Sequence, residues 1–127
     1  MAVNPHSIVH IDDNGVHILA FHRDERGMAS QDFVRQFFAN EFLKTAAAMH
    51  LLVIDLGGVL SLDSAALGPL VQKLREVQEQ KGKMALTGVQ SPALREIFAL
   101  TRFDKVFPIL PTRPEAVAMV RGEKPKR

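Results

Sequence analysis

The 127-residue sequence contains no cysteine, no tryptophan and no tyrosine. Without cysteine the chain can form neither a disulfide framework nor a cysteine-ligated zinc or iron–sulfur site, and it has no thiol nucleophile. Without tryptophan and tyrosine, a base-stacking surface would have to use the eight phenylalanines, most of which follow core patterns. These absences exclude several kinds of redox and metal enzyme and give no indication of nucleic-acid binding.

A strong charge bias and a long apolar run are missing as well. Sixteen basic residues against 14 acidic ones give a formal net charge of +2, too small to indicate a nucleic-acid partner. No apolar run approaches the roughly 18 residues of a membrane-spanning helix, and residues 1–7 lack the pattern of a signal peptide. We therefore expect a cytoplasmic protein with no membrane span.

The size and composition predict one globular domain. A hydrophobic content of 46% and a charged content of 24% are ordinary for a folded protein, and 127 residues leave no room for a second domain. We expect a short N-terminal extension over residues 1–7, a domain over 8–120 and a basic disordered tail over 121–127.

Apolar periodicity predicts an α/β fold. Asn14-Gly15 between two β-rich stretches is a strong hairpin signal, and a polar stretch over 22–27 is expected to be a mobile loop. The continuous apolar run 51–56 indicates a strand covered on both faces. The expected strands are 8–12, 16–21, 51–56, 83–87 and 106–110. The expected helices are 29–47, a second from Ser64 to near Gly82, a third from Pro92 to about 101, and 112–120. We therefore expect a central mixed sheet of about five strands with about four helices.

Histidines and glycines give no catalytic or metal motif. His10, His17 and His22 lie near the first hairpin, but strand alternation places His17 and His22 on opposite faces. Gly57-Gly58 is followed by no lysine and so does not match a phosphate-binding loop. Ser64 lacks the glycines of a hydrolase nucleophile elbow, and no histidine follows His50 to serve as its base. We expect no enzyme activity, no cofactor and no metal.

The most distinctive local feature is the Asp63-Ser64 pair at the predicted start of a helix. Either side chain could serve as the N-cap, which typically stabilises a helix by about 1 kcal/mol. The same position is also suited to modification, because the free N–H groups and positive dipole end of a helix stabilise a phosphate. Residue types and spacing alone leave both interpretations open.

The run from Val53 to Gly68, VIDLGGVLSLDSAALG, resembles the signature of STAS domains. That family pattern is an apolar strand ending in Asp-Leu, a short loop with a spaced apolar residue, then Asp-Ser or Asp-Thr at the start of a helix. Further similarity follows in KGK at 81–83 and in SPALREIF at 91–98. The resemblance extends from about Ile8 to Val120 and implies a STAS-like α/β sandwich.

The resemblance also implies a function. In the family's anti-sigma factor antagonists, the serine after the aspartate is phosphorylated by a partner that is both serine kinase and anti-sigma factor. Only the unphosphorylated form binds that partner. Carried over to this sequence, Ser64 is the phosphorylation site, Asp63 orients it and Asp55 lies at the strand end beneath it. The partner-binding or site-supporting residues are then Asp55, Ser61, Asp63, Ala65, Ala66, Leu67 and Gly68.

Two departures from the family pattern affect which partner the chain would bind. Ala65-Ala66 replaces the Ser or Thr and Gly that often follow the phosphorylated residue, which adds bulk at this corner. The family's Gly-Glu-Leu-Asp segment is absent, and HRDERG stands at 22–27 instead. The alternatives are a scaffold subunit that forms homo-oligomers, or a transport-accessory protein, either acting without phosphorylation.

Overall fold

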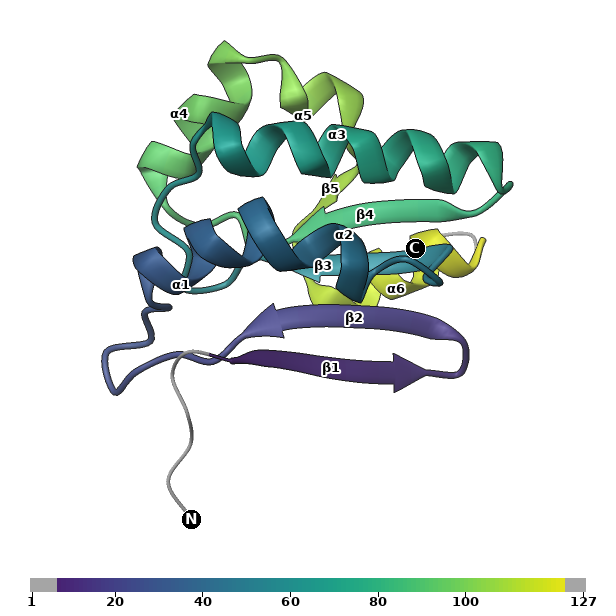
Figure 1. Cartoon of the computed structure of the whole chain (residues 1–127), viewed down its shortest axis with the longest axis horizontal. Coiled ribbons are helices and arrows are strands. Elements are labelled where there is room, and N and C mark those ends of the chain that lie inside the picture. The colour runs from purple at the N-terminus through teal and green to yellow at the C-terminus, as the bar shows by residue number, and fades with distance from the viewer. Residues whose placement is uncertain (1–6, 123–127) are drawn as a thin grey trace.

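The computed structural model describes residues 7–122, in which one five-stranded mixed sheet forms the centre (Figure 1). β1 pairs antiparallel with β2, and the strands from β2 to β5 are parallel. The predicted mixed sheet is therefore confirmed. Residues 1–6 of the expected extension and 123–127 of the expected tail lie outside the described residues. In sheet order the strands are β1 (Ile8–Asp13), β2 (Val16–Phe21), β3 (Leu51–Asp55), β4 (Lys83–Thr87) and β5 (Ile109–Leu110).

The β1–β2 hairpin turns at the predicted Asn14-Gly15 pair. Both residues have positive φ, 51° and 94°, as a turn that matches the twist of a hairpin requires. The Asp12 carboxylate accepts the Gly15 N–H at 2.9 Å, which fixes the turn from within. The register pairs Ile8 with Phe21, and β1 forms one edge of the sheet.

Side chains cap the starts of α1, α3, α4 and α6. Ser30, Asp63, Ser91 and Thr112 each accept a backbone N–H in the first turn of the helix that follows. The helix predicted over 29–47 is present as three consecutive segments, the middle one π-helical. Within residues 7–122 the helical segments are α1 (Gln31–Gln36), η1 (Phe37–Glu41), α2 (Phe42–Thr45), α3 (Ser64–Glu79), α4 (Pro92–Leu100), α5 (Phe103–Val106) and α6 (Arg113–Arg121).

The strand predicted over 106–110 is shorter than expected. Only Ile109 and Leu110 pair with β4, and the preceding residues form α5, closed by the Phe107 N–H to Phe103 carbonyl bond. The Phe103 and Phe107 rings lie 5.4 Å apart between centroids. Pro108, which has no N–H to donate, then separates this turn from the strand. Five helices result if α1, η1 and α2 are counted as one.

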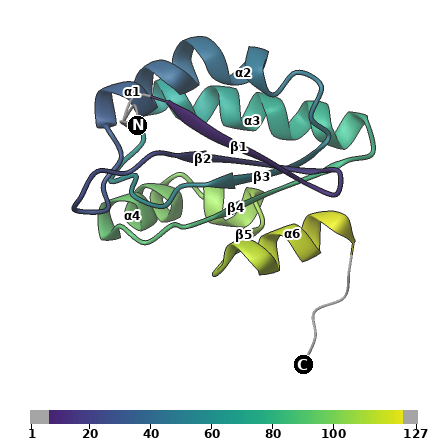
Figure 2. The same cartoon turned by 90° about the horizontal axis from the view of Figure 1, so that it is seen from below.

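Helices cover both faces of the sheet. The larger core lies between the sheet and the helices α1 to α4, and it includes contacting rings of Phe21, Phe37, Phe38 and Phe42. The smaller core lies on the opposite face, where α6 packs on β2, β3 and β4 (Figure 2). This two-sided cover explains the continuous apolar run of β3.

α6 ends one residue beyond the predicted domain boundary. Arg121 is its last residue, and its guanidinium binds the backbone carbonyl and carboxylate of Asp13. Gly122, with φ of 85°, caps the helix in the left-handed conformation. Arg121 is therefore part of the fold rather than of the tail.

A buried lysine on α3 links this helix to the end of α2. The Lys73 side chain on α3 is 1% exposed and donates a hydrogen bond to the Ala46 carbonyl at the end of α2. Lysine is a good donor for the free carbonyls at a helix C-terminus. Burial lowers the pKa of Lys73, and nearby Glu76 opposes that shift.

Candidate functional site

The loop over residues 56–63 connects β3 to α3, and Asp55 organises its beginning. One Asp55 oxygen accepts the Gly57 N–H at 2.9 Å. The other accepts both Nε and Nη2 of Arg113 on α6, at 3.1 and 2.9 Å. Because Asp55 is only 7% exposed, this two-bond ion pair compensates a carboxylate that would otherwise be costly to bury.

Glycine makes this close arrangement possible. Gly88, just after β4, has φ of 74° and approaches Asp55 and Gly57 closely. A β-carbon at Gly88 would lie 2.3 Å from an Asp55 carboxylate oxygen and 2.5 Å from the Gly57 nitrogen. The carboxyl ends of β3 and β4 can therefore meet here only if residue 88 has no side chain.

Four hydrogen bonds from three residues hold the middle of the loop. The Gln31 side chain on α1 accepts the Leu60 N–H at 3.0 Å and donates to the Ser61 carbonyl at 3.2 Å. The Ser91 hydroxyl donates to the Leu60 carbonyl at 2.7 Å. The Ala29 N–H donates to the Gly58 carbonyl at 2.9 Å. The loop is thus fixed by residues on either side of it in sequence.

The loop ends at the start of α3, where Asp63 is the N-cap. Its carboxylate accepts the Ala65 N–H at 3.1 Å. Ser64 is the first helical residue and is exposed, and its hydroxyl has no hydrogen-bond partner among residues 7–122. The aspartate therefore takes the capping role, and the serine hydroxyl is left facing solvent.

Residues 64–68 differ in how far their side chains are exposed. Ala65 and Gly68 are exposed and Leu67 is half-buried, whereas Ala66 is 1% exposed. Leu60, at the loop tip, exposes 40% of its surface. We define the α3 corner as the exposed residues of the loop and of the start of α3: Leu60, Asp63, Ser64, Ala65 and Gly68. Asp63 is its one charged residue.

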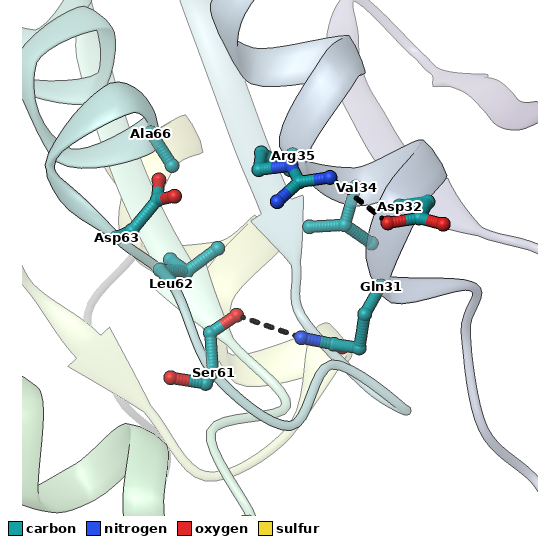
Figure 3. A pocket seen from close by; sticks show the side chains of 8 residues that line it. All are labelled: Gln31, Asp32, Val34, Arg35, Ser61, Leu62, Asp63 and Ala66. Carbon is teal, nitrogen blue, oxygen red and sulfur yellow. Dashed lines mark hydrogen bonds and ion pairs between the residues drawn. The ribbon is translucent and has the colours of Figure 1, made fainter.

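A shallow pocket of about 200 Å³ adjoins the α3 corner, between the starts of α1 and α3 (Figure 3). Buried Val34, Leu62 and Ala66 contribute apolar surface to it. Asp63 and Arg35 lie on opposite sides of it, and Arg35 forms an ion pair with Asp32 at 3.0 Å. The remaining lining residues are Gln31 and Ser61.

The structure brings together most of the residues expected at the site. The loop end and the start of α3 contain seven of them: Ser61, Asp63, Ser64, Ala65, Ala66, Leu67 and Gly68. Asp55 lies at the strand end as expected, but its oxygens bind Gly57 and Arg113 rather than the start of α3. Ala66 contributes to the pocket wall and to the core rather than to the outer surface.

Gln31, Arg113 and Ser91 were not anticipated at this site. Ser91 also caps α4, with its oxygen accepting the Leu94 N–H. Gln31 and Arg113 carry no local signal, because their partners lie 29 and 58 positions away. Only the tertiary arrangement reveals them.

The polar stretch over residues 22–27, expected to be a mobile loop, contains a turn that Asp24 closes with Met28. The Asp24 carboxylate accepts the N–H groups of Met28 and Arg26, and these bonds, that from Met28 foremost, lower the pKa of Asp24. The Gly27 N–H also donates to the Asp24 carbonyl. The aspartate thus closes a compact turn by hydrogen bonding to its own backbone.

Neither a metal-binding cluster nor a membrane-spanning helix occurs within residues 7–122. Within residues 7–122, no three histidine, cysteine, aspartate or glutamate side chains gather closely enough to bind a metal ion. His10 and His17 bind each other at 2.9 Å on the hairpin. Across the same residues, no helix is both long and apolar enough to cross a membrane.

Comparison with known proteins identifies the family pattern over most of the chain. The family described as STAS domain matches residues 24–116. An anti-sigma factor antagonist from Mycobacterium paratuberculosis is 30% identical, with 94% of this chain and 99% of that chain covered and a TM-score of 0.59. No curated protein matches the sequence.

Two other solved structures have the same fold. An anti-sigma-factor antagonist (STAS) domain protein from Planctomyces limnophilus is 25% identical, with 90% and 97% coverage and a TM-score of 0.63. A Thermotoga maritima protein described as an anti-sigma factor antagonist is 24% identical, with 92% and 97% coverage and a TM-score of 0.65. The latter similarity supports the fold alone.

Proposed function

The chain belongs to the STAS domain family, and on that premise we propose that it is a non-enzymatic protein-binding regulator whose docking is switched off by phosphorylation of Ser64. Its partner is an anti-sigma factor that is also a serine kinase. The observation that carries this proposal is the Ser64 hydroxyl, exposed and without a hydrogen-bond partner among the described residues.

Phosphate at Ser64 is compatible with the fold. It would stand at the N-terminus of a 16-residue helix, where the free N–H groups and the dipole favour an anion. The neighbouring Asp63 carboxylate opposes this by like-charge repulsion. Because Ser64 is exposed, its modification needs no repacking of the core.

The effect on docking follows from the chemistry of the α3 corner. A partner that packs on Leu60, Ala65 and Gly68 makes close contact with uncharged groups, of which Leu60 is a large exposed hydrophobic residue. A phosphoserine carries about −1.5 to −2 charges. Such a contact would remove water from these charges without offering hydrogen bonds or opposite charges in its place, which is unfavourable. The loop is held by Gln31, Ser91 and Ala29, so the switch acts by charge on a preformed surface rather than by rearrangement.

Phosphate mapping tests the proposed site. The purified chain is incubated with ATP and the serine kinase of its own organism's sigma-regulating system, and the product is mapped by mass spectrometry. We expect one phosphate on Ser64, lost in Ser64→Ala and retained in Ser61→Ala. Ser61 is the matched control because it lies in the same loop but is half-buried.

Binding of the same kinase tests the switch. Isothermal titration calorimetry of the phosphorylated chain, or of Ser64→Asp, should give at least about tenfold weaker binding than the unmodified chain, a loss of about 1.4 kcal/mol. An unlabelled Ser64, together with equal binding by Ser64→Asp, would contradict the proposed function.

A further inference from the structure

The two edges of the sheet differ in how they are protected. β5, at one edge, is two residues long, and Pro108 and Pro111 bracket it without N–H groups to offer. β1, at the other edge, is six residues long and contains no proline, glycine or lysine. Edge strands usually carry such protection because unpaired backbone groups otherwise invite another strand.

The ladder pattern identifies the unpaired groups of β1. The His22 N–H donates to the Ser7 carbonyl, so Ser7 and His22 form a hydrogen-bonded pair just before the β1–β2 register. Hydrogen-bonded and non-hydrogen-bonded pairs alternate along an antiparallel ladder. The backbone groups of Val9, Ile11 and Asp13 therefore also point toward β2. Those of Ile8, His10 and Asp12 therefore face outward, with no described strand beside them.

We propose that this edge pairs antiparallel with β1 of a second copy of the chain, with the two-fold axis at Ile11. His10 of each copy then lies opposite Asp12 of the other, and their outward backbone groups exchange hydrogen bonds. This register opposes no like charges: Asp12 faces a histidine and Asp13 faces Val9. A single surface that complements itself is what a two-fold dimer requires.

Side chains on both faces support this register. Ile11 lies opposite buried Ile18 in the hairpin yet remains 36% exposed, beside the core under α6. Pairing Ile11 with its copy covers this exposed edge of the smaller core. On the other face, the His10 Nε2 bonds to the His17 Nδ1. In the tautomer in which His17 donates this bond, the proton of His10 is on Nδ1, which can then donate to Asp12 of the second copy. One Asp12 oxygen binds Gly15, and the other is available.

The proposal is independent of phosphorylation. β1 and the start of α3 lie well apart in Figure 1, with α1 between them. A dimer through β1 thus leaves the α3 corner of each copy accessible. The dimer would present two such corners and would be unaffected by loss of the Ser64 hydroxyl.

Oligomeric state tests the proposal on the full chain. Because the interface is small, sedimentation equilibrium should give a dimer dissociation constant between about 10 µM and about 1 mM. Ile11→Lys places two cations at the two-fold axis and should raise this constant at least about tenfold. Leu100→Lys, at an apolar residue 75% exposed on α4, is the matched control and should leave it unchanged.

Cross-linking tests the register. The chain has no cysteine, so Ile11→Cys introduces a single thiol. Across the axis the two residues form a non-hydrogen-bonded pair with Cα atoms about 4.5 Å apart, within disulfide range. The matched Val9→Cys thiols would be about 13 Å apart along the strands and should not cross-link. A monomer up to about 1 mM, or a dimer in which Ile11→Cys does not cross-link, overturns the proposal.

Discussion

Two aspartates bound the loop between β3 and α3, and they act in opposite ways. Asp55 is buried, and its two oxygens tie the strand end to Gly57 and to Arg113 of α6. Asp63 is exposed and caps α3 with one hydrogen bond. The first maintains the architecture around the loop, and the second sets the start of the helix that presents Ser64. Asp55 therefore links elements that are distant in sequence, whereas Asp63 acts only within the first turn of α3.

Removing Asp55 should have the largest effect on stability. Asp55→Ala leaves the Arg113 guanidinium and the Gly57 N–H without their acceptor. Loss of one partner of a buried ion pair costs about 3–5 kcal/mol, and we expect about 2–3 kcal/mol because Arg113 is partly exposed. Urea denaturation would show this as a lower transition midpoint. A change below about 0.5 kcal/mol would assign Asp55 no structural role.

Gln31→Ala should have the next largest effect. It leaves the Leu60 N–H and the Ser61 carbonyl without partners, at an expected cost of about 1–2 kcal/mol. Hydrogen exchange should show faster exchange of the Leu60 amide. The neighbouring Asp32→Ala, on the same helix but without contact to the loop backbone, is the control and should leave that amide unchanged.

Asp63→Ala should be milder than Asp55→Ala. Loss of an N-cap typically costs about 1 kcal/mol and frays only the first turn. Asp63→Ser, which retains a capping oxygen, should restore most of the stability. Equal destabilisation by Asp63→Ala and Asp55→Ala, measured by the same urea titration, would refute the contrast between the two residues.

Gly68→Ala should give the smallest effect. Apart from its chain neighbours and its own helix backbone, no atom lies within 4 Å of the position that a β-carbon would occupy, and alanine is favoured over glycine in a helix by about 0.5–1 kcal/mol. Pro69 follows, however, and disfavours the helical conformation of a preceding residue that carries a β-carbon, so the two terms offset each other. Thermal unfolding should therefore show a nearly unchanged midpoint. Gly88→Ala provides the contrast, because there the added carbon collides with Asp55 and Gly57.

The start of α3 could be predicted from the sequence because its signals are local. An aspartate, a serine and the spacing of Leu67, Leu70 and Leu74 lie within a few turns of one another. The Asp55–Arg113 pair joins residues 58 positions apart, and the Gln31 contacts cross about half that separation. The hydrophobic periodicity of the sequence does not indicate contacts between residues so far apart.

The prediction was also incomplete where turn chemistry replaced regular structure. The polar stretch at 22–27 resembles a mobile loop by composition, yet Asp24 closes it by bonding to the Met28 and Arg26 amides. The last strand was overestimated because the apolar residues from Phe103 to Phe107 satisfy their packing in a helical turn. Both features depend on local hydrogen bonding that hydrophobicity does not encode.

The buried Lys73 makes the stability of the fold rise with pH in the alkaline range. Its pKa is lowered by burial, so between that lowered value and the ordinary 10.5 the unfolded chain binds more protons than the folded one. Stability therefore rises with pH through this interval. Urea midpoints should increase as the pH rises toward 10.5, because the neutral amine costs less to bury than the ammonium. Lys73→Met should flatten that increase, which would assign it to the side chain that links α3 to α2.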